Sequence, residues 1–308
     1  MRKIVFISLV KIYVKTFKTI IYKSLALIYL MVYKKYLVAA SKLDKAGINI
    51  TAQMSQFRKN PLLSGLQKDA ASFDFYLSDK EIIYTENIDL EKINKYDFVI
   101  FASKHKSEKG ERTISIHAPG NWKKAEFGGH EGKVCRSSAL FQKQLFEKLD
   151  ENIRQYNLRD YKLTLECTHH GPLIDKPCVF VEIGSTEEEW SDRKAAFVVA
   201  KSLSEVINSF KENPYNEIAV GIGGPHYCPN FNKIHLKSNT AISHVIPQYA
   251  LPLDEEMVKE AMEKTEEEVD FVLLDWKGIG NSDERQRILD ILDKLYIRYK
   301  RTSEINKR

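Results

Sequence analysis

Residues 161–190 read YKLTLECTHHGPLIDKPCVFVEIGSTEEEW, and this stretch decides the expected fold. Two short apolar runs, Tyr161–Cys167 and Cys178–Ile183, have the length and the bounding turn residues of buried strands. Ser185 and Glu188 then form a capping-box signal that predicts a long helix over Thr186–Phe210. Strand, turn, strand and helix in succession indicate an α/β fold.

The same alternation continues on both sides of this stretch. The expected strands are Tyr36–Ala40, Phe98–Ala102, Thr113–His117, Glu217–Ile222 and Phe271–Leu274, with a hairpin made of Phe73–Leu77 and Glu81–Tyr84. The expected helices are Ala39–Phe57 with Ser41 as its N-cap, Ser137–Tyr156, Asp254–Glu267 and Asp283–Tyr299. We therefore expect a single α/β catalytic domain over residues 37–308, built on a mixed, largely helix-covered sheet.

The composition of the chain is that of a globular protein. Of its 308 residues, 43% are hydrophobic and 29% are charged, which excludes a mostly disordered or fibrous chain. The four cysteines are far apart and form no CxxC pair. That pattern favours reduced, buried thiols over a disulfide framework, so we expect a cytoplasmic protein.

The formal charge of +5 originates in the N-terminal segment. Residues 1–36 contain eight basic and no acidic residues, which leaves 39 basic and 42 acidic residues, a charge of −3, for the rest. Lysines interrupt the segment too often for a spanning helix, and no secretory cleavage site follows it. We expect a basic, apolar extension outside the fold, with the functional protein starting near Met31. Contact with an anionic membrane surface is the alternative if these residues are made in the cell.

Histidines follow the predicted strands repeatedly. The motifs FVIFASKH, TISIHAPGNW, KLTLECTHHGP, EIAVGIGGPHYCP and AISHVIP contain His105, His117, His169, His170, His226 and His244, and VFVEIG adds Glu182. Open α/β sheets bind ligands at the carboxyl ends of their strands. Because six of the eight histidines fall at such positions, we expect most of them to share one cleft.

The chemistry available to this cleft is limited. The sequence contains no G-x-S-x-G elbow, no P-loop, no Gly-rich dinucleotide fingerprint after the first strand and no HExxH helix. Imidazole and carboxylate groups remain, and they act as general acids, general bases or metal ligands. A histidine that deprotonates water and a bound metal that activates water both lead to hydrolysis. His169 and His170 are adjacent and would point to opposite sides of an extended backbone, so we expect His170 to face the site and His169 to support it.

A basic stretch surrounds two of the candidate histidines. Between Ser103 and Lys124, six basic residues stand against two glutamates, a local charge of +4. Such a rim could guide the end of a polyanion into the cleft, and a solvated lysine-rich loop is the alternative.

Taken together, the motifs resemble those of the archaeal-type D-aminoacyl-tRNA deacylases, a family that also has plant members. The matching pieces occur in the same order from about residue 37 to residue 280: FASKH, HAPGNW, ECTHHGP, FVEIGSTEEEW, GIGGPHY, SHVIPQYA and LLDWKG. The resemblance implies a core similar to peptidyl-tRNA hydrolase and nucleoside phosphorylases. It also implies zinc-dependent hydrolysis of the ester that joins a D-amino acid to the terminal ribose of tRNA, which recycles tRNA and keeps D-residues out of translation.

Carried onto this sequence, the resemblance places the site at the strand-end residues. We expect His170, His169 and His117 to be catalytic and His105, Glu182, His226 and His244 to bind Zn²⁺. Asn121 or Trp122 would contact the terminal adenosine, and the backbone N–H groups of Gly223 and Gly224 would stabilise the oxyanion. The attacking water would be bound to zinc or deprotonated by His170.

The expected partner is the 3′ end of aminoacyl-tRNA, and we expect a monomer with no stable protein partner. Two other functional hypotheses stay open. One is a nucleoside-phosphorylase-like or peptidyl-tRNA-hydrolase-like enzyme on the same core, and the other is a non-catalytic protein that binds the end of tRNA.

Overall fold

The computed structural model describes residues 33–59, 71–86, 90–210, 215 and 217–307. Residues Tyr33–Arg308 form one compact unit. The expected N-terminal extension lies outside the described residues, except for its last four. Tyr33 is buried and Tyr36 is a fully buried residue of the first strand, so residues 33–36 belong to the fold. Within the described residues, no helix has the length and apolar character needed to cross a membrane.

Two sheets organise this unit, where the sequence predicted one. The first has six strands in the order β2-β1-β3-β6-β4-β5, and the second has four in the order β10-β9-β7-β8. The strands of the first are β1 Lys35–Ser41, β2 Ser72–Ser78, β3 Phe98–Lys106, β4 Thr113–His117, β5 Lys162–Leu165 and β6 Cys178–Ser185. Those of the second are β7 Glu217–Ile222, β8 Thr240–Ile246, β9 Phe271–Leu274 and β10 Tyr299–Arg301. The mixed α/β class is confirmed.

All strand pairs are parallel except β4 with β6. The strands β4 and β5 therefore run against the other four strands of the first sheet. A residue near the end of β4 consequently lies beside the start of β6, whereas a residue near the end of β3 lies beside the end of β6.

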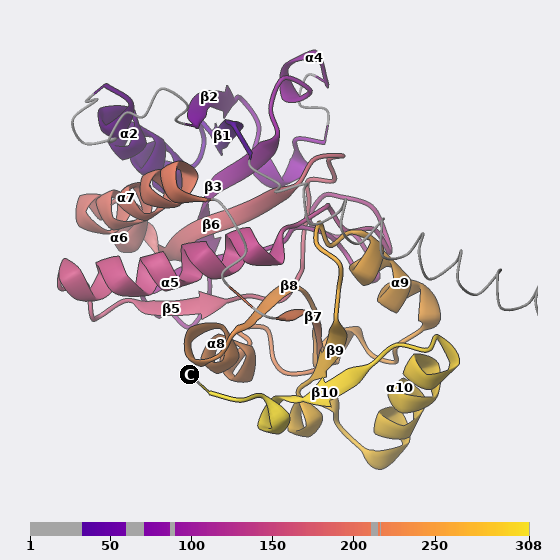
Figure 1. Ribbon diagram of the computed structural model, residues 1–308. Helices are drawn as coiled ribbons and strands as arrows, with labels where there is room; N and C mark the ends of the chain where they lie inside the picture. Colours follow the sequence, from indigo (N-terminus) through magenta and orange to yellow (C-terminus); the bar gives the residue numbers. More distant parts are fainter. Residues whose placement is uncertain (1–32, 60–70, 87–89, 211–214, 216, 308) are drawn as a thin grey trace, which may run out of the picture. The chain divides into compact units, whose positions relative to one another are not determined.

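Helices cover one face of the six-stranded sheet (Figure 1). The long helices on this face are α2 Lys45–Lys59, α5 Ala139–Gln155 and α7 Arg193–Ser209. On β6, Val179, Val181 and Ile183 pack into the core under these helices, while Cys178 and Phe180 pack into a smaller cluster on the opposite face. This period of two is that of a strand buried on both sides, and it assigns Glu182 to the face opposite the helices.

The remaining helices are shorter or accompany the second sheet. They are α4 Leu90–Ile93, α6 Glu187–Trp190, α8 Pro229–Lys237, α9 Glu255–Glu263 and α10 Ser282–Lys294, with 3₁₀ turns η1 Ile82–Tyr84, η2 Gln248–Ala250, η3 Trp276–Ile279 and η4 Thr302–Glu304. The sequence pattern does not predict α8.

Two local predictions near β1 and β2 were wrong. Phe73–Leu77 and Glu81–Tyr84 form no hairpin, because β2 pairs in parallel with β1 and residues 82–84 form η1. The N-cap of α2 is Asp44, which accepts a hydrogen bond from Gly47 N–H (3.0 Å), and not Ser41, which lies in β1. Parallel pairing joins segments separated by a helix, so local sequence patterns do not reveal it.

The predicted helix Thr186–Phe210 is broken into α6 and α7. The capping box is made by Thr186 and Glu189, one residue later than expected. Asp192 then begins a new helix, because its carboxylate accepts hydrogen bonds from the backbone N–H groups of Lys194 (2.8 Å) and Ala195 (3.1 Å). The same carboxylate accepts a hydrogen bond from the Tyr161 hydroxyl (3.0 Å), which ties the helix start to the entry of β5.

We predict that Asp192→Ala lowers the free energy of unfolding by about 1–2 kcal/mol, because the substitution removes the cap of α7. Urea denaturation of the full chain measures this change. Asp192→Asn keeps an acceptor oxygen and should therefore lower the free energy of unfolding by less. Equal stability of the alanine variant and the unsubstituted protein would show that the cap contributes nothing.

Candidate active site

The centre of the candidate site is Glu182, on the β6 face that the long helices leave uncovered. In the sheet register, His105 on β3 lies opposite Gly184, and His117 on β4 lies opposite Phe180. Residues 180, 182 and 184 point to one side of the strand, because side chains alternate along it. Three neighbouring strands therefore present His105, Glu182 and His117 on the same face, and β6 lies in the middle.

Gly184 makes room for His105. A Cβ atom at position 184 would lie 2.6 Å from the Cβ and from the carbonyl oxygen of His105. Real Cβ atoms do not come so close to other atoms, so a larger residue would displace the imidazole.

The loop that follows β5 adds a second carboxylate, Glu166, which the sequence analysis did not select. Its Oε1 lies 3.1 Å from His105 Nδ1, and its Oε2 lies 2.8 Å from His226 Nε2 and 3.4 Å from His169 Nε2. An acid at the end of the apolar run KLTLEC was the available signal, since a buried strand end rarely contains an unpaired charge.

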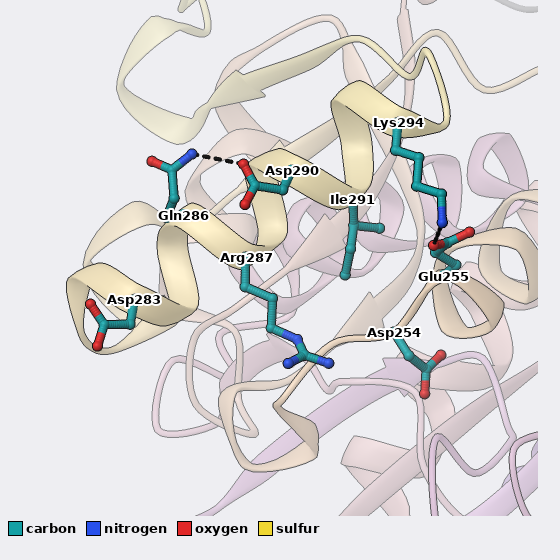
Figure 2. Close-up of a pocket in the computed structure, with 8 residues that line it drawn as sticks. All are labelled: Asp254, Glu255, Asp283, Gln286, Arg287, Asp290, Ile291 and Lys294. Carbon is teal, nitrogen blue, oxygen red and sulfur yellow. Dashed lines mark hydrogen bonds and ion pairs between the residues drawn. The ribbon is translucent and has the colours of Figure 1, made fainter.

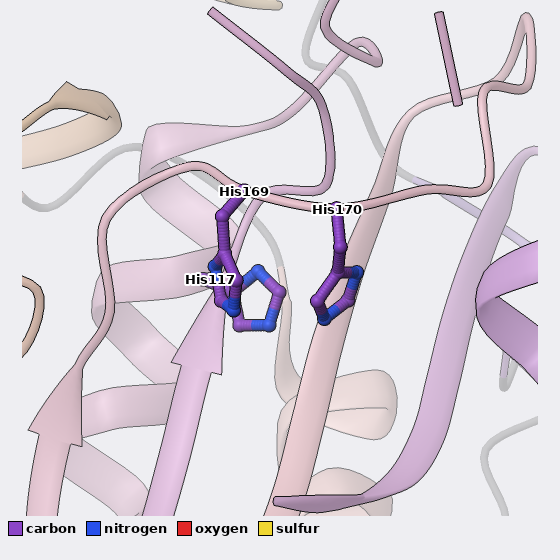
Figure 3. A group of neighbouring side chains, drawn as sticks. All are labelled: His117, His169 and His170. Atoms are coloured by element: carbon purple, nitrogen blue, oxygen red, sulfur yellow. The ribbon is translucent and has the colours of Figure 1, made fainter. Parts of the chain in front are cut away.

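His117, His169 and His170 lie next to one another (Figure 3). Their ring centroids are 4.2–4.8 Å apart. Nε2 of His170 lies 3.7 Å from Glu182 Oε1, and Nε2 of His117 lies 3.9 Å from the same oxygen. The two adjacent histidines do not point to opposite sides, because His170 has a left-handed backbone with φ of 44°. Both rings therefore face the cluster.

Each of these three imidazoles places Nδ1 next to a backbone carbonyl. The carbonyl is that of Ala118 for His117 (3.2 Å), of Cys167 for His169 (2.8 Å) and of Gly171 for His170 (2.7 Å). A carbonyl only accepts, so Nδ1 bears the proton and Nε2 keeps a lone pair. The three Nε2 atoms are thus the ones available as bases or ligands.

The charges of the site are set by burial and pairing. Burial opposes the charged form of His105 and of His226, but contacts with carboxylates, and with Cys167 for His226, raise their pKa values to about 11 and about 10. Burial would raise the pKa of Glu166 and of Glu182, yet their histidine contacts hold both well below the usual range. Burial and the neighbouring imidazoles lower the pKa of His169, which keeps it neutral.

The cluster opens into a cleft of about 940 Å³, lined among others by His105, His169, His170, Glu182 and His226. A separate hollow of about 550 Å³ lies beside α10 and the start of α9, with Arg287, Asp290 and Lys294 on its wall (Figure 2). None of the predicted site residues lines this second hollow. The first cleft is therefore the candidate active site.

Comparisons with known proteins agree with the motifs. The profile of the family described as D-aminoacyl-tRNA deacylase matches residues 92–300. The D-aminoacyl-tRNA deacylase of Methanocaldococcus jannaschii is 33% identical over 262 residues, which cover 82% of this chain and 94% of that protein. The deacylase of Archaeoglobus fulgidus is 36% identical over 259 residues, which cover 80% of this chain and 89% of that protein. The chain belongs to the D-aminoacyl-tRNA deacylase family.

A solved structure has the same fold as this chain. The crystal structure of AF0625, described as a conserved protein of unknown function, matches with a TM-score of 0.78 and 28% identity. The match covers 90% of this chain and 98% of that one. The expected resemblance to the deacylase family is confirmed by the family profile and the named relatives.

In this family member, the structure does not bring His244 into the cluster. Its Nδ1 contacts the Thr168 hydroxyl (3.2 Å) and its Nε2 contacts the Lys264 carbonyl (3.3 Å). Both ring nitrogens are thus used inside the fold. We leave His244 out of the proposed metal ligands.

The four predicted substrate-binding residues have structural contacts. The Asn121 amide donates to the Gly128 carbonyl (2.8 Å), and the Trp122 indole donates to the Val245 carbonyl (3.0 Å). The N–H of Gly223 donates to Ile246 (2.8 Å) and that of Gly224 to Gly278 (2.9 Å). Neither glycine N–H is available to an oxyanion in this arrangement, so that part of the hypothesis is not retained.

The donor atoms fit a metal ion. Nε2 of His117 is buried and has no hydrogen-bond partner among the described residues. Ligand atoms of His117, His169 and His170 lie within 4.8 Å of one another, as do those of two further groups, Cys167–His169–His226 and His105–Glu166–Glu182. An imidazole that donates Nδ1–H to a carbonyl and presents Nε2 is the usual arrangement of a metal-binding histidine, and all three residues of the first group have it.

We predict that Gly184→Ala lowers the free energy of unfolding by about 1–3 kcal/mol, because the added methyl group overlaps His105. The same change should displace His105 from Glu166 and reduce turnover. Urea denaturation and a turnover assay on one protein preparation measure both effects. Unchanged values of both would contradict the steric role of Gly184.

Burial lowers the pKa of His244 to about 4 from an ordinary 6.5. A histidine whose pKa is lower in the folded than in the unfolded state stabilises the fold at pH values above its unfolded pKa. That contribution is lost as the pH falls from 6.5 through 4. We predict that the unsubstituted protein loses roughly 3 kcal/mol more stability over this range than His244→Gln does. Urea denaturation at several pH values measures the difference, and parallel curves would refute the assignment.

Proposed function

We propose that this chain hydrolyses the ester bond between a D-amino acid and the 3′ end of tRNA, releasing the free D-amino acid and tRNA. The observation that carries the proposal is the cluster of three imidazoles and two buried carboxylates that opens into the cleft of a member of this family. Such a reaction belongs to the carboxylic ester hydrolases and needs an activated water and a binding cleft. The imidazoles and carboxylates can activate the water, and the 940 Å³ cleft can bind the substrate.

We propose His117, His169 and His170 as the residues that hold a zinc ion, through Nε2. Zinc bound there would lower the pKa of a water to about 7. This assignment exchanges two sets of roles in the sequence-based hypothesis, which placed the metal on His105, Glu182, His226 and His244. The reason is that Nδ1–H of each chosen imidazole donates to a backbone carbonyl, which leaves Nε2 for the metal.

Glu182 is the proposed general base. Its Oε1 lies 3.7–3.9 Å from Nε2 of His170 and of His117, so a water held beside these groups would be within its reach. A buried carboxylate beside these imidazoles can accept a proton from such a water and pass it to the leaving ribose oxygen. In a metal-free version of the same step, His170 would deprotonate the water.

His105 and His226 are proposed as positioning residues. His105 contacts both carboxylates, at 3.1 Å and 3.5 Å, and its Nε2 contacts the Tyr227 hydroxyl at 2.9 Å. His226 contacts Glu166 at 2.8 Å and Cys167 Sγ at 3.4 Å. Ring nitrogens with these partners fix the carboxylates in place.

The 3′ end of tRNA is the proposed partner. Lys104 and Lys106 line the cleft and offer positive charge to phosphates. Part of the positive charge predicted from the sequence is neutralised, because Lys104 pairs with Glu81 (3.0 Å) and Arg112 pairs with Asp160 (2.7 Å). The monomeric state and the cytoplasmic location remain predictions from the sequence.

The direct test uses matched D-Tyr-tRNA and L-Tyr-tRNA with the purified full chain, with and without a chelator. We predict selective release from the D-substrate that is lost with the chelator. His117→Ala should lower the zinc content and reduce the rate roughly 100-fold or more. His244→Gln is the matched control and should keep its zinc.

Several outcomes would contradict the proposal. Retained activity in metal-free protein would exclude the zinc version and leave Glu182 or His170 as the base. Unchanged zinc content in His117→Ala would exclude the ligand set. Turnover that requires phosphate, or release of N-blocked peptides, would favour the phosphorylase-like or peptidyl-tRNA-hydrolase-like activity instead.

A further inference from the structure

Three chain segments meet beside the catalytic histidines with their backbones in contact. The N–H of Gly171, next to His170, donates to the Phe127 carbonyl (2.9 Å). A Cβ atom on Gly128 would overlap the carbonyl oxygen of Ile83, and one on Gly171 would overlap the backbone of Gly129. Only glycine permits such an approach, so the segments around Ile83, Phe127 and Gly171 lie at fixed positions relative to one another.

Further hydrogen bonds hold the Phe127 segment. The Asn121 amide donates to the Gly128 carbonyl (2.8 Å), and Gly129 N–H donates to the Glu86 carboxylate. Gly128 and Gly129 both have a left-handed backbone, with φ of 72° and 79°. The backbone under Phe127 is therefore anchored on two sides.

The side chains on this anchored backbone are large, aromatic and exposed. Tyr84 is 47% exposed and Phe127 is 59% exposed. Both line the 940 Å³ cleft that contains His169 and His170. Rings that a fold exposes on a fixed backbone next to its reactive groups offer flat apolar faces to a ligand without the cost of ordering the backbone.

We propose that Tyr84 and Phe127 form a stacking platform for the terminal adenine base of tRNA. The inference rests on the proposed function, because the ester is attached to the ribose of that terminal nucleotide. A base joined to that ribose must bind within a few ångströms of the catalytic cluster. Aromatic side chains bind bases through their π faces, and each stacked base contributes enough to change affinity by roughly 5- to 150-fold.

The platform also gives Asn121 a role. The sequence-based hypothesis had Asn121 touching the adenosine directly. In the structure its amide holds the Gly128 carbonyl, and Gly128 follows Phe127. Asn121 is thus a positioning residue of the platform.

The test uses the RNA trinucleotide CCA with 2-aminopurine in place of the terminal adenine, because stacking on an aromatic ring quenches 2-aminopurine fluorescence. Titration with the full chain should quench the probe. Phe127→Ala and Tyr84→Ala should each raise its dissociation constant on the order of 10-fold, and Phe127→Trp should restore binding. Tyr296→Ala is the matched control, because Tyr296 is 95% exposed and lines a different hollow.

Turnover gives a second readout. Phe127→Ala should raise KM for D-aminoacyl-tRNA and change kcat little, because the platform binds the base and not the reacting carbonyl. A Phe127→Ala variant that binds the probe as tightly as the unsubstituted protein would overturn the proposal. So would a KM effect that follows the amino-acid side chain of the substrate, which would assign the rings to that side chain. Quenching by a protein that hydrolyses no D-aminoacyl-tRNA would sustain the platform and reject the proposed function.

Discussion

Two carboxylates inside the protein set the conditions for the rest of the site. The side chains of Glu166 and Glu182 are 0% and 4% exposed, and a charge so deeply buried is costly unless it is paired. Two of the neighbouring histidines, His105 and His226, supply the pairing, and His117, His169 and His170 complete the cluster. The histidines, in turn, are oriented by carbonyls, by Tyr227 and by Cys167. The charged centre and the imidazoles around it therefore hold each other in place.

The topology explains why these residues can meet. Because β4 runs antiparallel to β6, the end of β4 brings His117 to one side of Glu182, while the end of β3 brings His105 to the other. Glycines then allow the remaining segments to approach, with Gly184 under His105 and Gly171 beside His170. The site thus lies across the face of a mixed sheet and not along one edge of a parallel one. The same close packing fixes the backbone beside Tyr84 and Phe127, whose exposed rings line the cleft.

Much of this arrangement could be predicted from the sequence, and the failures have identifiable causes. The strands Thr113–His117, Glu217–Ile222 and Phe271–Leu274 were predicted with the observed bounds, because short apolar runs between turn residues are a local signal. The convergence of five histidines and Glu182 was also predicted. His244 follows the same local pattern, but its contacts with Thr168 and Lys264 depend on long-range packing. The shared direction of His169 and His170 depends on one left-handed residue, which the sequence does not mark.

The proposed metal site consists of three imidazoles, each with its proton on Nδ1, that would bind zinc through Nε2. X-ray absorption at the zinc edge, on the full chain loaded with one equivalent of zinc, tests it most directly. We predict only nitrogen and oxygen neighbours, with the multiple-scattering pattern of about three imidazoles. A zinc–sulfur distance of about 2.3 Å would instead place the metal on Cys167, His169 and His226 and contradict the account.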